Sequence, residues 1–318
     1  MNYDRSQVDR DIDNKLVSII LDVGCYLRAK GYQFTTVTPE THRRVLKRII
    51  DLQELSEKEI LRQFFGWNRA FPQEYLPSYI LQLLNDADLL INQAGTIKSR
   101  VRFATLNAKL FAHSSFPTLE ESAIFFGPDS YRFVNFLHRL NLPAQTILDI
   151  GCGSGVGALS LESEMKILCD INHEVFNFAK ANARLNNCEN VAFYHSDILS
   201  SAPAGADLLI SNPPFIMDQR NRSYRNGGDY HGAEIAFKIV KQAMEYLRTG
   251  ASLAMYTGSC IINGEDRFFR LCEEIISEKK FLFSYEEIDP DIFSEELSLI
   301  QYKNVERIAA VGLVLTHK

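Results

Sequence analysis

The sequence predicts an α/β fold in which a doubly wound, mostly parallel sheet follows a smaller helical region. Two observations support this prediction. From residue 146 onward, short apolar runs typical of buried strands alternate with helix-compatible segments, which is the pattern of βαβ units. Before residue 117, apolar residues instead recur at three- and four-residue spacings, which indicates amphipathic helices.

The first apolar run of the α/β region, at 146–150, ends in a glycine-rich turn. Gly151, Gly153 and Gly155 alternate there, and glycine allows a ligand to approach the backbone where a Cβ would block it. A dinucleotide fingerprint needs G-x-G-x-x-G, but here the third glycine comes one residue early. No Gly-Lys-Ser/Thr follows, so a phosphate-binding P-loop is excluded as well. A tight connection without any ligand is the alternative at this point.

The chain length of 318 residues fits one large domain plus a smaller one, and we expect the division at 1–116 and 117–318. No run of eighteen or more apolar residues occurs, so no membrane span is expected. The N-terminus lacks the apolar core of a signal peptide. Six cysteines show neither C-x-x-C pairing nor clustering with histidine, so we expect reduced thiols, a cytoplasmic protein and no bound metal.

Residues 1–116 carry a weak positive charge within an acidic chain. They hold 16 basic and 13 acidic residues, whereas the whole chain has a net charge of −6. We predict helices at 5–30, from Thr38-Pro39, over about 57–67 and at 79–84. Thr38 is a capping residue followed by proline, and Ser56-Glu57-Lys58-Glu59 is a capping box.

An alternating segment at 96–103 predicts a strand, and a second strand is expected at about 106–111. Helices followed by such a ribbon resemble a winged-helix domain. In one continuous strand, Lys98, Arg100 and Arg102 would share a face. That face could contact nucleic-acid phosphates, and the domain could equally be a substrate or dimer platform.

The segment Asp149-Ile150-Gly151-Cys152-Gly153-Ser154-Gly155 resembles motif I of the class I S-adenosylmethionine (SAM) methyltransferases. The resemblance implies a Rossmann-like domain with a seven-stranded, mostly parallel sheet, closed by an antiparallel hairpin at 281–288 and 307–315. It also implies SAM as the cofactor.

Two acids follow in the order that this family would have. Asp170 ends the second predicted strand, 19 residues after Gly151, where Rossmann-like folds place an acid for ribose hydroxyls. Its alternative role is a helix N-cap. Asp197 follows the third strand, and the resemblance assigns it to the adenine amino group with Ile198 on the ring; a turn-stabilising role is the alternative. The complete set assigned to SAM is Asp149, Gly151, Cys152, Gly153, Gly155, Asp170, Ile171, Asp197, Ile198 and Asn212.

The fourth strand is followed by Asn212-Pro213-Pro214-Phe215, an NPPF motif. It is similar to the motif of methyltransferases that act on nitrogen conjugated to a π-system, including the HemK-like glutamine enzymes and the adenine and guanine enzymes. The lone pair of such a nitrogen is delocalised, so the nitrogen is a poor nucleophile unless other groups activate it. The Asn212 side-chain oxygen and the Pro213 carbonyl would accept its N–H bonds, and Phe215 would stack on the planar group. These four residues are the predicted catalytic residues.

The sequence therefore predicts a SAM-dependent methyltransferase that methylates nitrogen in a protein glutamine or in an RNA or DNA base. The alternatives are a small-molecule methyltransferase and a SAM-binding protein with non-methylating chemistry. The polar loop Arg220–Gly232 offers Arg220, Arg222, Tyr224 and His231 as substrate contacts, with a solvated loop as the alternative. Residues 126–130 are expected to help form the pocket, or only to join two domains.

Overall fold

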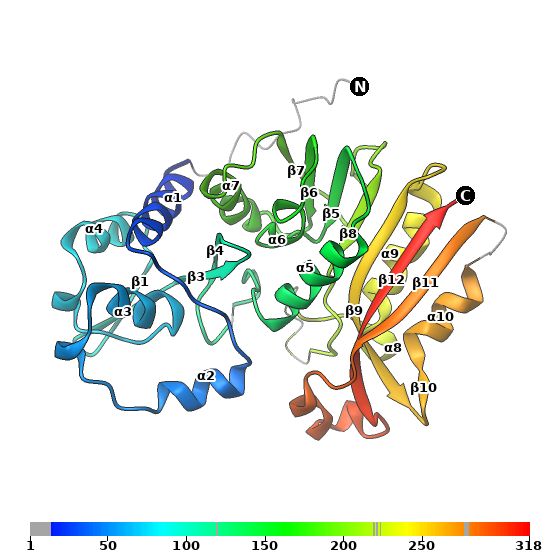
Figure 1. Ribbon diagram of the computed structural model, residues 1–318. Coiled ribbons are helices and arrows are strands. Elements are labelled where there is room, and N and C mark those ends of the chain that lie inside the picture. Colours follow the sequence, from blue (N-terminus) through cyan, green and yellow to red (C-terminus); the bar gives the residue numbers. More distant parts are fainter. Residues whose placement is uncertain (1–13, 119, 219, 221, 223, 277–279) are drawn as a thin grey trace.

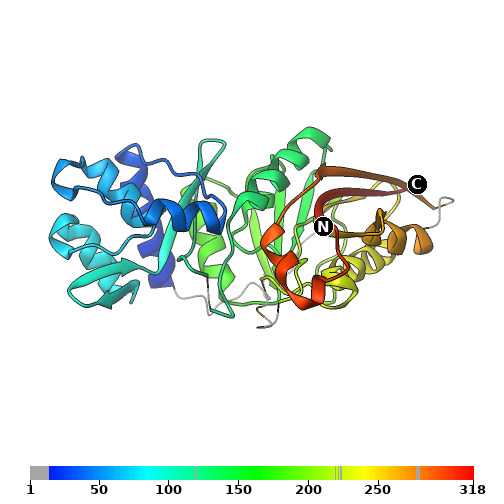
Figure 2. The same cartoon turned by 90° about the horizontal axis from the view of Figure 1, so that it is seen from below.

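The computed structural model describes residues 14–318 except 119, 219, 221, 223 and 277–279. Two parts lie side by side in an elongated molecule (Figures 1 and 2). One part is built from helices and short strands up to β4, and the other is a twisted sheet covered by helices on both faces.

The large sheet has the strand order β11-β12-β9-β8-β5-β6-β7, with the short β10 paired to β9. Strands β5 to β9 are parallel to one another, and β12 is antiparallel to both β9 and β11. The predicted mostly parallel sheet with a closing hairpin is thereby confirmed. The strands are β5 (Thr146–Ile150), β6 (Met165–Asp170), β7 (Val191–His195), β8 (Leu208–Ser211), β9 (Ser252–Ile262), β10 (Glu265–Asp266), β11 (Phe281–Asp289) and β12 (Arg307–His317).

Helices cover both faces of this sheet because side chains alternate along each buried strand. Ile147 of β5 packs in a cluster with Phe133 and Phe136 of α5, whereas its neighbour Leu148 packs with Ile239 of α9 on the other face. The helix expected after the glycine turn is only one turn long. The helices are α5 (Pro128–Leu140), α6 (Val156–Leu159), α7 (Val175–Leu185), α8 (Asp229–Gly232), α9 (Glu234–Tyr246) and α10 (Arg267–Ile275), with 3-10 turns η5 (Ser294–Ser298) and η6 (Ile300–Tyr302).

The N-terminal helices begin at the capping residues that the sequence predicts. Thr38 accepts a hydrogen bond from the Thr41 amide at 3.3 Å, and Ser56 and Glu59 form the predicted capping box. The first helix is described from residue 14, so its predicted start at residue 5 lies outside the described residues. The elements are α1 (Asn14–Ala29), α2 (Pro39–Leu46), η2 (Leu52–Glu54), α3 (Glu57–Leu61), η3 (Arg62–Gly66), η4 (Gln73–Tyr75) and α4 (Ser78–Asp86).

The predicted strand at 96–103 is in fact two strands that belong to two separate ribbons. β2 (Thr96–Ser99) pairs with β1 (Leu90–Gln93), and β3 (Val101–Leu106) pairs with β4 (Lys109–Ser114). The chain breaks at Arg100, where the Ser99 hydroxyl donates to the Val101 carbonyl at 2.6 Å. The predicted second strand at 106–111 is shifted toward the C-terminus because its first residues form the hairpin turn.

This break also separates the three cations predicted to share a face. Arg100 is exposed, the Lys98 ammonium donates to the Phe116 carbonyl, and Arg102 is buried at 3% exposure. The Arg102 Nε donates to the Gly66 carbonyl at 3.0 Å. The predicted basic face of a single wing strand is therefore wrong.

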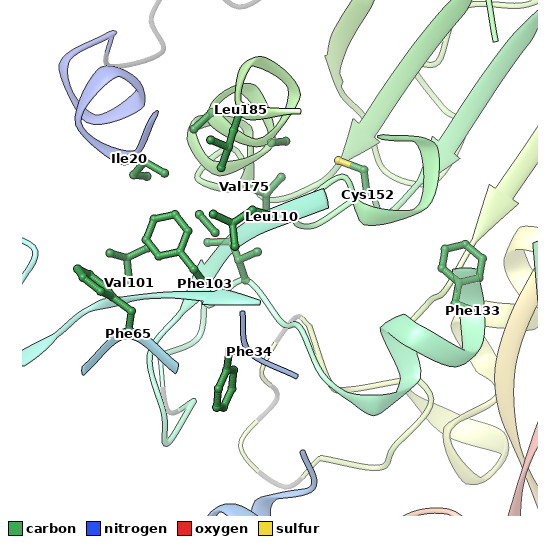
Figure 3. Close-up of a cluster of buried hydrophobic side chains, with 14 of the residues drawn as sticks. Ile20, Phe34, Phe65, Val101, Phe103, Leu110, Phe133, Cys152, Val175 and Leu185 are labelled. Carbon is green, nitrogen blue, oxygen red and sulfur yellow. The ribbon is translucent and has the colours of Figure 1, made fainter. Parts of the chain in front are cut away.

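Helix α7 joins the two parts of the molecule through a shared hydrophobic core (Figure 3). Ile20 of α1, Phe103 of β3, Leu110 of β4 and Leu185 of α7 point toward one another in this cluster. Gly24 of α1 permits the close approach, since a Cβ there would lie 2.6 Å from a methyl carbon of Leu185. The core thus extends across the boundary expected near residue 116.

Two asparagines one turn apart, Asn182 of α7 and its C-cap residue Asn186, also bond the free edge of β4. Asn182 accepts from the Ala112 amide at 2.7 Å and donates to the Ala112 carbonyl at 3.0 Å. Asn186 bonds the Leu110 amide and carbonyl in the same way, at 3.0 and 2.8 Å. Residues i and i+4 of a helix are about 6 Å apart, close to the two-residue repeat of a strand, so the helix can bond to this edge.

None of the helices that the structure describes combines the length and the apolar character that crossing a bilayer requires. All six cysteines are unbridged, and the described residues contain no cluster of three or more His, Cys, Asp or Glu side chains suited to a metal ion.

Candidate functional site

A cavity of about 330 Å³ opens at the carboxyl ends of β5, β6, β7 and β8. This is the edge at which open α/β sheets bind ligands. The structure brings most of the predicted site residues together in its wall. The predicted residues in the wall are Asp149, Gly151, Cys152, Gly153, Asp170, Ile171, Asp197, Ile198, Asn212, Pro213 and Pro214.

The glycine turn contributes space to this cavity. Gly151 and Gly153 have positive φ values of 68° and 50°, and a Cβ added to either would meet no protein atom within 4 Å. Gly155 also has a positive φ, 77°, but a Cβ there would lie 2.8 Å from Leu159, so it faces the protein and does not line the cavity.

The amides of the turn already donate to protein groups. The Gly151 and Cys152 amides both donate to the Cys169 carbonyl, at 2.9 and 3.0 Å. The Gly153 amide donates to Asp170, and the Gly155 amide donates to the Cys152 carbonyl at 2.8 Å. A phosphate site needs several free amides, and these four amides of the turn are already used.

Asp149 is buried beneath the turn at 2% exposure, and its Oδ2 accepts from the Ala158 amide at 3.0 Å. Burial raises the pKa of this carboxyl to about 7, and the neighbouring Asp170 contributes in the same direction. The bond to Ala158 fixes the start of α6 against the end of β5.

Asp170 is also buried, at 9% exposure, and its two oxygens bond two segments of backbone. Oδ2 accepts from the Gly153 amide at 3.0 Å and Oδ1 from the Asn172 amide at 2.9 Å. Burial raises its pKa, while these bonds act in the opposite direction. The N-cap position of α7 is Glu174, so the alternative prediction of an Asp170 N-cap is wrong.

Two isoleucines line the outer part of the cavity. Ile171 is 56% exposed, which is unusual for so large an apolar side chain beside a cavity. Ile198 has a φ of +53°, a strained backbone conformation for a β-branched residue. Asp197, next to Ile198, is exposed. An exposed apolar surface with an exposed carboxylate beside it suits a planar polar ring.

The NPPF segment begins where β8 leaves the sheet. The Ser211 hydroxyl donates to the Ile150 carbonyl at 2.8 Å, which holds the end of β8 against β5. Within the described part of the chain, the Asn212 side chain has no hydrogen-bond partner, so its amide is available to a ligand.

A second, smaller cavity of about 50 Å³ shares Asn212, Pro213 and Pro214 with the first. Phe215 lines this second cavity and packs edge-on against Phe293, with ring centroids 5.6 Å apart. The two cavities therefore meet at the NPPF segment, with Phe215 on the smaller side.

Two aromatic residues, Phe125 and Tyr224, line the walls of both cavities. The sequence predicts Tyr224 as a substrate contact, but it gives no site role to Phe125. Their rings are nearly parallel, with an interplanar angle of 8° and centroids 6.3 Å apart. Of the predicted segment 126–130, Ser130 lines the first cavity and Asp129 the second, while Phe126 stacks on His113 instead. Phe125 directly precedes that segment, and this proximity was the available signal.

Some residues of the loop Arg220–Gly232 bond to other parts of the protein, and others are exposed. Arg222 donates to Asp218 at 2.9 Å and to the Thr118 carbonyl at 3.1 Å, and the Tyr224 hydroxyl donates to the same carbonyl at 2.8 Å. Arg220 is exposed, and His231 lies beside Arg267 in a separate surface depression. Tyr224 is thus the member of the predicted set that lines the cavities.

Comparison with known proteins shows which proteins this part of the chain resembles. Residues 132–284 match the model of the methyltransferase small domain. The chain is 32% identical to the release factor glutamine methyltransferase of Aliivibrio fischeri in an alignment 150 residues long that covers 41% of this chain and 52% of that protein. It is 28% identical to the ribosomal RNA large subunit methyltransferase G of Pseudoalteromonas translucida in an alignment 161 residues long that covers 47% of this chain and 39% of that protein.

The chain spans about half the length of the curated relatives it matches. A solved structure, SMU.776 complexed with SAH, superposes with a TM-score of 0.50 at 12% identity, over 74% of this chain and 65% of that one. At this identity the likeness concerns the fold. Together with the strand order, it shows a Rossmann-like fold of the kind found in methyltransferases, and residues 132–284 are similar to the methyltransferase small domain.

Proposed function

We propose that this protein is a SAM-dependent methyltransferase that methylates a planar amide or amine nitrogen. The observation that carries the proposal is that two cavities of unequal size meet at Asn212, Pro213 and Pro214. The larger cavity would hold the cofactor and the smaller one the acceptor. Methyl transfer requires such an arrangement, because the sulfonium methyl group and the nitrogen must come into line at near-attack distance.

The first cavity suits SAM by charge and by shape. SAM carries a sulfonium, an ammonium and a carboxylate group, which leave it with a net positive charge, and the cavity offers the acidic side chains of Asp149 and Asp170. In this proposal Asp170 binds the ribose hydroxyls, as a carboxylate accepts two hydrogen bonds from a diol. Ile171 and Ile198 pack on the adenine ring, and Asp197 accepts from its amino group.

The NPPF segment would act on the acceptor nitrogen. The Asn212 side-chain oxygen and the Pro213 carbonyl would accept its two N–H bonds, which raises the electron density on nitrogen and orients its lone pair. Phe215 is buried against Phe293 and Tyr256, so it offers the planar group a fixed wall. Pro213 and Pro214 have no N–H and stiffen the backbone that carries these groups.

A protein glutamine is our first choice of acceptor, with an RNA or DNA base as the second. Several relatives are named release factor glutamine methyltransferases, and one is named a ribosomal RNA methyltransferase. The predicted basic strand face does not form, and the chain as a whole is acidic, so the expected attraction to nucleic acid is weak. Whichever acceptor it methylates, we propose that this protein is located in the cytoplasm.

The test begins with calorimetry of SAM and its demethylated product, followed by transfer of labelled methyl groups from SAM to separated protein, RNA and small-molecule fractions. Asn212→Ala removes the oxygen that orients the nitrogen. We expect it to lower the transfer rate by roughly 10²- to 10³-fold, as loss of one oriented polar group does in other enzymes. Because Asn212 also lines the SAM cavity, the SAM dissociation constant of the variant is measured alongside the rate.

Absence of SAM binding would contradict the proposal at its first step. Label found only in the small-molecule fraction would replace the glutamine and nucleobase acceptors with a metabolite. SAM consumption without label in any fraction would indicate non-methylating chemistry.

A further inference from the structure

We propose that Asp129 is a further catalytic residue, a buried carboxylate that accepts the proton which the acceptor nitrogen loses when it is methylated. This proposal rests on the function proposed above. Asp129 lies in the first turn of α5 and lines the second cavity together with Asn212 and Phe215. It is 2% exposed, so the cavity is its route to other molecules.

The strand register and a bond from Tyr256 bring Asp129 and Asn212 to the same edge of the sheet. Ser211 and Met255 are the last paired residues of β8 and β9, so Asn212 and Tyr256 follow at the same level. The Tyr256 hydroxyl donates to Asp129 Oδ1 at 2.6 Å. Tyr256 thus holds Asp129 at the wall of the cavity that Asn212 also lines.

Several groups face the Asp129 carboxyl and control its protonation. Arg132 of α5 donates to its Oδ1 at 3.3 Å and also pairs with Asp289 of β11 at 2.9 Å, so its charge is shared. Burial raises the pKa of Asp129, while the bonds from Tyr256 and Arg132 lower it. Facing the same cavity from the loop after β8 are Tyr224 and Arg225.

The step balances without any additional reactant. The nitrogen lone pair forms the new N–CH₃ bond as the S–CH₃ bond breaks, and that electron pair stays on sulfur as a neutral thioether. As the N–CH₃ bond forms, the nitrogen becomes cationic and its N–H groups strongly acidic, and in the same step one of the two protons leaves its carbonyl acceptor and passes to the Asp129 carboxylate. The proton leaves to solvent when the product departs.

The experiment measures single-turnover methyl transfer from labelled SAM to whichever extract fraction, protein or RNA, the wild-type protein labels. Asp129→Asn preserves size and can still accept the bond from Tyr256, but it is a far weaker base. We expect its rate to be about 100-fold lower, within the usual range for a general base. The SAM dissociation constant should stay within about threefold of wild type, and thermal unfolding checks that the variant is folded.

The pH profile provides a readout that a purely structural role would not change. Because the carboxylate is the active form, the wild-type rate should fall as the pH is lowered through the Asp129 pKa, and Asp129→Asn should lose this acid limb. Tyr256→Phe removes a bond that lowers the Asp129 pKa, so its acid limb should move to higher pH. Asp22→Asn, at an exposed site on α1, is the matched control and should behave as wild type.

Three outcomes separate the two proposals. If the wild type binds SAM but labels no fraction, the proposed function and the role of Asp129 both fall. If it labels a fraction and Asp129→Asn keeps the wild-type rate and acid limb, only the role of Asp129 falls. If Asp129→Asn is slow but Tyr256→Phe leaves the acid limb in place, Asp129 is not the titrating group and the proposal is wrong.

Discussion

Each glycine in the turn after β5 is required at its position for its own physical reason. All three have positive φ, where an L-residue costs about 1–2 kcal/mol. At Gly155 a side chain would also collide with Leu159. At Gly151 and Gly153 a side chain would enter only the cavity, so the ligand is what it would displace.

Gly153→Ala should therefore affect SAM binding more than folding. We expect a stability loss of about 1 kcal/mol from the positive φ, and a decrease in SAM affinity of at least about tenfold because the new methyl group occupies cofactor space. Thermal unfolding of the apoprotein and calorimetric titration with SAM measure the two effects separately.

Gly250→Ala is the matched control for this substitution. Gly250 has a φ of +83° and no atom within 4 Å of an added Cβ, but it lies in the turn before β9 and outside the cavity wall. It should lose similar stability and bind SAM normally. Equal loss of SAM affinity in both variants would show that backbone strain, not occupied space, explains the Gly153 result.

At the level of elements, α7 has a function beyond connecting two strands. Asn182 is completely buried and bonds both the edge of β4 and, at 2.9 Å, the Ser154 carbonyl in the glycine turn. The Asn182 side chain thus links the N-terminal part of the molecule to the glycine turn. The helix itself was predictable from periodicity, but these contacts between distant segments were not.

Asn182→Ala should destabilise the protein by about 2–4 kcal/mol, because it leaves three buried backbone groups without their partner. Chemical denaturation measures this loss. Asn177→Ala on the same helix removes a side chain whose oxygen has no hydrogen-bond partner among the described residues, so it should cost much less. Equal losses would contradict the bonding role that we assign to Asn182.

At the level of the whole molecule, the shared core crosses the boundary between the predicted domains 1–116 and 117–318. This division remains a prediction. Leu185 of α7 packs against Gly24 of α1 and within the same cluster as Phe103 and Leu110 (Figure 3). A core that crosses the proposed boundary couples the stability of the two parts.

We therefore expect the full chain to unfold in one calorimetric transition with equal calorimetric and van't Hoff enthalpies. Leu185→Ala should lower the stability of that single transition by about 2–5 kcal/mol, as other buried leucine truncations do. Leu282→Ala, at a 59% exposed site on β11, is the control and should change stability by less than about 0.5 kcal/mol. Two separate transitions, with only one shifted by Leu185→Ala, would support independent domains instead.

The sequence by itself determined the order and type of the α/β elements, and the strand ends at which the site residues lie. It could do so because buried strands, glycine turns and caps are encoded in local patterns of residues. From these patterns Asp149, Asp170 and Asn212 were expected near one another, since parallel strands bring their carboxyl ends to one edge.

Only the tertiary structure decided the contacts between segments far apart in the chain. It divided 96–103 into two ribbons and buried Arg102, because packing against Gly66 and neighbouring aromatic rings outweighed the alternating pattern. It also placed Asp129 beside Tyr256, which lies 127 positions away, and opened a second cavity next to Asn212. Such contacts depend on how whole elements pack, and no local pattern of residues encodes them.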